Sequence, residues 1–458
     1  MRNPVYQYTT FVAVKQEVAN RLYDPTKQFW SDAEIGSYLT EALRTWNALT
    51  NYWRGDFLFD SSPNQYWYDL TSQTNSLRPY TVTDADLYSQ MEYHLLEPSS
   101  GINPWTGSLQ FTADDLLNAV QRRRDELLSI TGCSIYRITT PAVNARITLP
   151  DTVLDVRRMA YFPAGGLNPL PSVMWQEDAW GAQAFDRNYT ILPPYTVVPP
   201  GQPQLYFLST QPPISFDVDT APGAGGYYEV LVTQAGAALS ATTPQLLYIP
   251  DDWSWAIKWG ALADLLSRES YSQDLPRAKY CETQYRMALA GLAKGSAIMQ
   301  LRANNVALQV DSVRDADLYQ TGWQALDAGP PTMGLTAGLN LMALLPKPDQ
   351  PLSVNYSLTA TVVENAPIPV SDGDFVQVGR DDLDALIDYT QHLAAFKQGG
   401  KEFTDTAPLL QRFLKQASLY GFKLKEMAEY TDTLLGIAER QEQTFPRVDA
   451  DNLSQITT

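Results

Sequence analysis

The chain has 458 residues, which is enough for several domains with buried cores. Its 51 acidic and 33 basic residues give a formal net charge of -18, which argues against an ordinary nucleic-acid-binding protein with a basic surface. Two cysteines are too few for a disulfide framework or a zinc site. We expect no secretory signal, because the first 18 residues lack a continuous apolar region, and no membrane span, because proline and glycine interrupt residues 328–346.

The first 55 residues predict a helical hairpin. Apolar side chains repeat at helical spacing over residues 11–22, and a turn around Asp24 follows. The stretch WSDAEIGSYLTEALRTWNALTNYWR, residues 30–54, then predicts a longer helix. Its Ser31 and Glu34 have the spacing of a capping box, in which each side chain accepts a hydrogen bond from the backbone N–H of the other residue.

More helices are predicted at residues 83–96 and 112–132, after a short aromatic strand at residues 65–70. Thr112 is placed to cap the start of the second helix, and Gly132 suits its C-terminal cap. The first 132 residues therefore indicate a mainly helical region.

Residues 133–250 have the character of β-structure. The segments are short, rich in β-branched and aromatic residues, and separated by proline and glycine. They are CSIYRITT, NARITLP, VRRMAYFP, QLYFLS, YYEVLVT and QLLYIP. We expect an antiparallel sandwich or barrel inserted between helices.

Two helices are predicted after Pro250, and Cys281 falls on the apolar stripe of the second one. Residues 339–363 predict a β-hairpin, in which LNLMALLP pairs with SVNYSLTATVV. The last helix carries an apolar seam from Leu410 to Ala438, about four heptads long. Residues 381–397 can cover about half of this seam, so we expect the remainder to contact another subunit.

The fold class is therefore α+β, with an N-terminal helical hairpin or bundle, an inserted antiparallel β domain and a long C-terminal helix. We expect six parts along the chain. They are an N-terminal helical domain (1–132), a β-rich domain (133–250), a helical pair (251–305), a β-hairpin region (306–375), a long helical hairpin (376–445) and a C-terminal tail (446–458).

Catalytic chemistry finds little support in the sequence. His94 and His392 are the only imidazoles, and neither lies in a recognisable motif. The carboxylate pairs 114–115, 251–252 and 381–382 fall at predicted helix starts, where capping and the helix dipole explain them. We therefore predict no catalytic site, no metal and no cofactor, and expect that the protein is not an enzyme.

The densest basic cluster is Arg122, Arg123 and Arg124, on the helix at residues 112–132. Two interpretations remain open. The three arginines form a solvated face paired with nearby acids, or they contact an acidic partner subunit or nucleic acid.

The start of the chain resembles the head-to-tail connector (adaptor) proteins of tailed bacteriophages, over about an eighth of its length. Trp30, Ser31, Asp32, Glu34 and Ile35 carry the resemblance, after a helix and a turn. It implies a structural protein of the virion neck, assembled in the host cytoplasm as a ring of about twelve copies. Its partners would be the portal protein above and a tail or nozzle protein below, with double-stranded DNA passing through the channel.

The same resemblance implies that the C-terminal segment docks on the portal. The candidate contact residues there are Phe445, Arg447, Val448, Leu453 and Ile456. The chain is more than twice as long as the usual adaptors of this family.

Two alternatives come from other classes of protein. A phage tail or baseplate protein could bind host-surface glycan through exposed aromatic side chains. A glycan hydrolase could use a pair of the many carboxylates in this chain.

Overall fold

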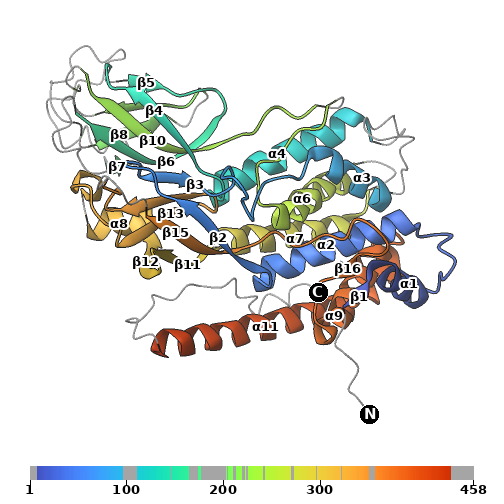
Figure 1. Cartoon of the computed structure of the whole chain (residues 1–458). Coiled ribbons are helices and arrows are strands. Elements are labelled where there is room, and N and C mark those ends of the chain that lie inside the picture. Colours follow the sequence, from blue (N-terminus) through green and yellow to red (C-terminus); the bar gives the residue numbers. More distant parts are fainter. Residues whose placement is uncertain are drawn as a thin grey trace.

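The structure is a computed structural model of the chain. It describes residues 8–95, 111–144, 146–163, 174–176, 203, 205–209, 213–218, 222, 225–240, 243–269, 273–295, 297–320, 322–349 and 356–434, with the backbone alone at 174–176, 205 and 422–434. The fold is α+β, as predicted. Figure 1 shows the β-sandwich above a larger curled sheet, and the helices gathered beside and below them.

The N-terminal helices are confirmed as α1 (Phe11–Arg21) and α2 (Asp32–Thr50). Asp24 organises the turn between them by accepting the backbone N–H groups of residues 28–30, and these hydrogen bonds lower the pKa of its carboxyl. The predicted capping box between Ser31 and Glu34 is confirmed only for Ser31. Ser31 Oγ accepts the N–H of Glu34, but the Glu34 carboxylate accepts the Tyr38 hydroxyl at 2.7 Å and Lys397 Nζ at 3.0 Å instead.

Four further helices pack against α2 or against one another. They are α3 (Asp84–Leu95), α4 (Ala113–Thr131), α6 (Ser254–Ser267, after the 3-10 turn η1, Asp251–Trp253) and α7 (Leu275–Leu292). Thr112 and Asp115 form a complete capping box on α4, and Gly132 ends that helix in the left-handed conformation with φ 58°. Cys281 is buried on α7, as its position on the stripe predicted.

The inserted β domain is a sandwich. One sheet has the strand order β4 (Tyr136–Pro141), β10 (Tyr227–Gln234), β6 (Val153–Phe162). The other has the order β5 (Arg146–Thr148), β9 (Ser215–Val218), β8 (Leu205–Ser209), β7 (Met174–Gln176), and all pairings except β7 with β8 are antiparallel. Phe216 and Tyr228 meet edge to face between the sheets, with ring centroids 5.5 Å apart.

The segment QLLYIP is not a strand, contrary to the prediction. Only Leu246 makes an isolated bridge, to Thr83, while Leu247 and Ile249 are buried in the helical core. Its apolar residues meet helices rather than a sheet, and a short apolar run does not distinguish between these two environments.

The second sheet has seven strands. Their order is β2 (Arg54–Asp60), β15 (Ser357–Val363), β11 (Ile298–Ala303), β12 (Val306–Ser312), β13 (Met333–Ala337), β14 (Leu341–Leu345), β3 (Trp67–Asp69). The predicted pairing of residues 339–345 with 353–363 is wrong, because β14 pairs with β13 and β3, whereas β15 pairs with β11 and β2. The alternating burial of Leu358, Ala360 and Val362 is confirmed.

The C-terminal part begins with β16 (Phe375–Val376), which pairs with β1 (Thr9–Thr10). The helices α9 (Arg380–Ala395), α10 (Gly400–Thr404) and α11 (Ala407–Leu434) follow. The long last helix is confirmed, and Leu410, Phe413 and Ala417 of its seam are buried. Seam side chains beyond residue 421 lie outside the described part. Within the described ranges, no helix has both the length and the apolar composition needed to cross a bilayer.

A buried polar cluster connects the sandwich to the segment between β12 and β13, which holds α8 (Val313–Tyr319) and the 3-10 turn η2 (Trp323–Ala325). Arg158 of β6 donates to Asp317 through Nε at 2.6 Å and Nη2 at 3.0 Å, and to Gln324 Oε1 at 2.8 Å. The buried Glu229 of β10 accepts Gln324 Nε2 at 2.8 Å. Planar, two-point pairing of this kind fixes orientation as well as distance.

We predict that Arg158→Met lowers the free energy of unfolding by about 3–5 kcal/mol, because it leaves the largely covered carboxylate of Asp317 without its cation and breaks the hydrogen bond to Gln324. Urea denaturation measures this change. The control is Arg137→Met, since Arg137 pairs with the same Glu229 at 2.6 Å but its side chain is 42 % exposed. We expect it to cost less than about 1 kcal/mol. Equal losses for the two variants would contradict a special role for the buried arginine.

Candidate partner-binding site and buried charges

The three arginines of the predicted partner-binding cluster have different surroundings. The Arg122 side chain is 65 % exposed and pairs with Asp264 at its tip. Arg123 is buried and donates to both carboxylate oxygens of Asp264, at 2.6 and 3.0 Å, and contacts Glu282 at 3.0 Å. Burial opposes its charge, but the hydrogen bonds to Asp264 prevail and raise the pKa of Arg123.

Arg124 is fully buried, where its Nη1 donates to the carbonyl of Ala237 and its Nε donates to Asp125, both at 2.9 Å. Arg123 and Arg124 therefore connect α4 to α6, α7 and the segment after β10. Helical spacing in the sequence could have predicted that Arg123 and Arg124 are buried and Arg122 is not. Positions 116, 120, 123, 124 and 127 share one buried face of α4, and Arg122 lies off it.

The other candidate residues, Phe445, Arg447, Val448, Leu453 and Ile456, lie outside the described residues. Of the candidate contacts, Arg122 is thus the one that the structure places on the surface. Its guanidinium is largely exposed and shares the Asp264 carboxylate with Arg123, so it can also meet a carboxylate of another molecule.

A buried charge cluster, missed by the sequence analysis, lies in the helical core. Glu41 of α2 and Lys258 of α6 form an ion pair, and Glu41 also accepts Trp259 Nε1 at 2.8 Å. Lys258 Nζ lies 3.1 Å from His94 Nε2. Burial lowers the pKa of Lys258, although Glu41 opposes it, and burial with the nearby Lys258 charge lowers the pKa of His94 far below its ordinary value.

His392 lies in an equally closed environment. Its Nε2 meets the Tyr280 hydroxyl at 2.9 Å, its Nδ1 meets Thr406 Oγ1 at 2.8 Å, and Phe403 stacks on its ring at 4.8 Å. Burial lowers the pKa of His392 to about 3. Both histidines are therefore neutral, inaccessible core residues, and neither is placed for acid–base chemistry on a substrate.

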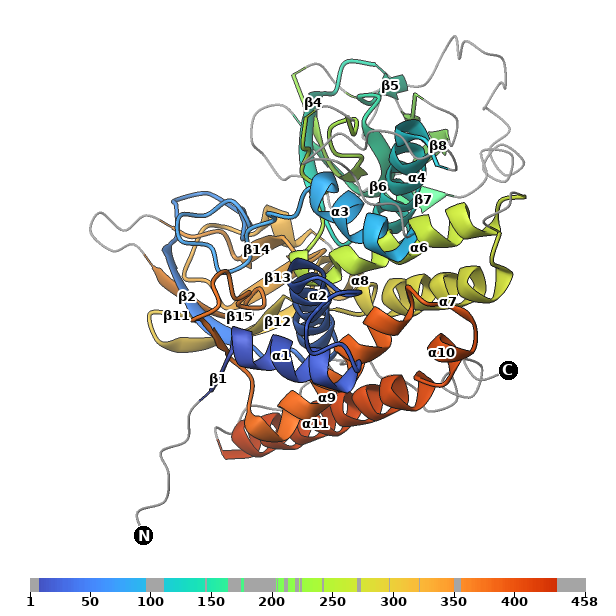
Figure 2. The ribbon, with the colours of Figure 1, turned by 90° about the vertical axis from the view of Figure 1, so that its right-hand side faces the viewer.

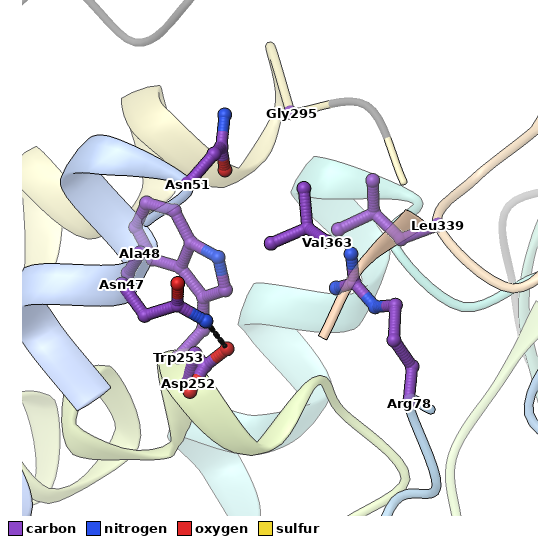
Figure 3. A pocket seen from close by; sticks show the side chains of 9 residues that line it. All are labelled: Asn47, Ala48, Asn51, Arg78, Asp252, Trp253, Gly295, Leu339 and Val363. Atoms are coloured by element: carbon purple, nitrogen blue, oxygen red, sulfur yellow. Dashed lines mark hydrogen bonds between the residues drawn. The ribbon is translucent and has the colours of Figure 1, made fainter. Parts of the chain in front are cut away.

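A small pocket lies where the end of α2 meets β15 (Figure 3). The buried Arg78 points into it, near Asp252 and Asn47. Asn47 Nδ2 donates to Asp252 at 2.6 Å, and burial raises the pKa of Asp252 to about 6. The volume is about 20 Å³. That is room for roughly one water molecule, so the pocket cannot hold an organic substrate.

The acidic pair at 251–252 does more than start a helix. Asp251 accepts the backbone N–H groups of Thr81 and Val82, and Asp252 accepts that of Ala366. Both carboxylates therefore fasten distant segments to the start of η1. Among the described residues, no group of three histidine, cysteine or acidic side chains is placed to hold a metal ion.

Among the described residues, these buried polar groups join parts of the chain that are far apart in sequence. Residues 85–308 match the family model of the SU10 adaptor protein. The matched part, just under half of the chain, is similar to a phage adaptor family. It runs from α3 through the sandwich to β12, and so does not include the residues around Trp30 that carry the resemblance noted in the sequence. No curated protein matches the chain.

Because both histidines are buried and neutral, we expect the folded protein to lose stability in acid. An unfolded histidine takes up a proton as pH falls through 6.5, whereas His392 stays neutral in the fold until about pH 3. His392 therefore does not reduce the free energy of unfolding above pH 6.5, and it reduces that free energy increasingly as pH falls below 6.5. Between pH 7.5 and 5.5 the loss is about 1.4 kcal/mol for each such histidine.

We predict that His392→Gln reduces the fall in unfolding free energy between pH 7.5 and 5.5 by about 1.4 kcal/mol. Urea denaturation at both pH values measures it. Phe403→Leu is the matched control, because it disturbs the same ring cluster without removing a titrating group. An unchanged pH dependence in His392→Gln would show that His392 is not held neutral.

Proposed function

We propose that this chain is a structural protein of the phage neck that joins the portal to the tail. About twelve copies would form a ring that lines the DNA exit channel, bound to the portal protein on one side and to a tail or nozzle protein on the other. The observation that carries the proposal is the match of residues 85–308 to a phage adaptor family. The assembled protein would be part of the virion neck, built in the host cytoplasm.

Charge supports a role around DNA rather than on it. A ring of twelve copies would carry a formal charge of 12 × -18 = -216. A wall of that sign repels the phosphate backbone, so that DNA passes without adhering.

We assign the partner contacts to two places. Arg122 is the exposed member of the arginine cluster, and its charge suits an acidic partner. The tail at 446–458, together with Phe445, is the segment that would reach the portal. In this arrangement residues 1–132, whose start resembles phage connectors, would be an adaptor-like domain that overlaps the matched residues 85–308. The seam of α11 beyond residue 421 would contact another subunit.

The glycan-binding alternative requires exposed aromatic rings on the β domain. In the described part of the sandwich, Tyr161, Tyr206 and Tyr228 are buried. Tyr227 is partly exposed but stacks on Phe162 with ring centroids 4.8 Å apart. These rings pack against other residues of the sandwich and do not support an exposed aromatic surface that binds carbohydrate. A hydrolase would need a pair of accessible carboxylates facing a cleft, and the pocket near Asp252 is too small for a sugar.

The decisive experiment measures the mass of the purified chain alone and mixed with the portal of the same virus, by sedimentation velocity and native mass spectrometry. We expect a monomer that assembles into a ring of about a dozen copies on the portal. A chain truncated after Thr444 tests the C-terminal contact and should bind the portal at least tenfold more weakly. A stable trimer that ignores the portal would contradict the proposal and favour a tail protein.

A further inference from the structure

The outer face of α7 carries an unusual concentration of positive charge for so acidic a chain. Lys279, Arg286 and Lys294 lie along one stripe of this helix and its C-terminal turn, with Thr283 and Ala290 between them. Lys279 and Lys294 are exposed, and the Arg286 side chain is 75 % exposed. We call these three residues the α7 stripe.

The chain itself neutralises little of this stripe. Arg286 pairs at 2.7 Å with Glu282, but that carboxylate is shared with the buried Arg123. Neither Lys279 nor Lys294 forms an ion pair with any residue that the structure describes. A row of exposed cations in which only Arg286 has an acidic partner of its own fits an acidic surface on another molecule.

The strand β2 offers such a surface. It is an edge of the seven-stranded sheet and is paired along all of its seven residues with β15 alone among the described strands. Asp56, Leu58 and Asp60 are exposed and alternate along it, so their side chains share one face. Leu58 is 66 % exposed between the two carboxylates. We call these residues the β2 acidic strand.

The two elements that carry these surfaces lie apart in the molecule. Figure 2 shows β2 at the left edge and α7 at the right, at about the same height. Their spacings also agree. Asp56 and Asp60 are about 13 Å apart along an extended strand. Arg286 and Lys294, which lies in the turn after α7, are about 12 Å apart when the helical rise is continued over that turn.

We infer that the α7 stripe of one copy binds the β2 acidic strand of a second copy. Two different surfaces that complement each other make a head-to-tail contact, which closes into a ring when the rotation per subunit divides the circle. The exposed Leu58 would be covered between the charges. This inference rests on the proposed function for the closed ring, and adds to it the residues that join neighbouring copies.

A second copy explains the surfaces better than DNA does. Contact with DNA would use the α7 stripe but leave the β2 acidic strand without a role, whereas a head-to-tail contact uses both. The carboxylates also suit an edge strand, because charged side chains prevent unwanted strand pairing while leaving the side-chain face open to a specific partner.

The test uses charge reversal in the full chain. One variant carries Lys279→Glu, Arg286→Glu and Lys294→Glu, and the other carries Asp56→Lys and Asp60→Lys. Lys401→Glu with Lys415→Glu is the control for added negative charge, since both lysines are exposed elsewhere. Circular dichroism and thermal melting check that each variant folds. Sedimentation velocity then measures self-association over protein concentration, at low and high salt, with and without portal.

We expect each reversal alone to weaken self-association at least tenfold, and the control to assemble as the wild type does. An equimolar mixture of the two reversed variants should assemble again, because each contact then joins two reversed or two native surfaces. High salt should weaken the wild-type contact. Both reversals combined in one chain should also restore assembly.

Three results would overturn the inference, and they separate it from the proposed function. If the wild type forms rings on the portal and both reversed variants do so equally well, the function stands and this interface is wrong. If the α7 reversal instead abolishes retention on double-stranded DNA and the mixture restores nothing, the stripe contacts nucleic acid. If the wild type stays monomeric under all conditions, both proposals fail.

Discussion

The ion pair between Glu41 and Lys258 is the interaction on which the helical part depends. Both groups are removed from water, so their desolvation is offset only by mutual attraction and by further hydrogen bonds from Trp259 and to His94. These partners come from α2, α3 and α6, and the bonds are directional. The pair therefore fixes how three helices pack, at the centre of the view in Figure 2.

Beyond this pair, α2 also contacts the end of β15 and the C-terminal helices, so its position determines how they pack. One turn and a half further along, Asn47 donates to Asp252 and to the carbonyl of Glu364, at 2.6 and 2.7 Å, next to the end of β15. Trp46 packs on Phe413 of α11 with ring centroids 5.8 Å apart. The helix thus has a different polar or aromatic contact on each side, which leaves few alternative packings of comparable free energy.

Local signals in the sequence predicted what local interactions determine. Thr112, Asp115 and Gly132 lie within one helix and its ends, and its cap and its termination were readable from those residues. Glu34 shows the limit of this reasoning. Its spacing from Ser31 suits a capping box, but Lys397, in the turn after α9 and 363 residues away, donates to the carboxylate instead. In the same way, the alternation of apolar residues in β15 predicted which face of the strand is buried. It did not predict that β15 pairs with β11 and β2.

The candidate site illustrates the same limit. Three consecutive arginines were visible as a cluster, but their division into one exposed and two buried side chains depends on Asp264, Glu282 and Ala237, which belong to other elements. Periodicity held part of the answer, since two of the three positions fall on the apolar face of α4. The spacing of the basic residues on α7 was also visible in the sequence, but only the structure shows that Arg286 pairs with Glu282 while Lys279 and Lys294 form no ion pair with a described residue.

Burial of cations changes how the net charge of -18 is to be understood. Arg124, Arg158 and Lys258 are buried or nearly so, and their charges stabilise contacts within the chain. Acidic side chains such as Glu41, Glu229 and Asp252 are buried as well, so the surface that faces other molecules carries fewer charges of both signs than the composition implies. Copies of such a chain repel one another at long range, but salt screens that repulsion beyond about 8 Å under physiological conditions. Close contact between copies is then decided by local complementarity, and the few exposed cations that remain unpaired decide where such contact can form.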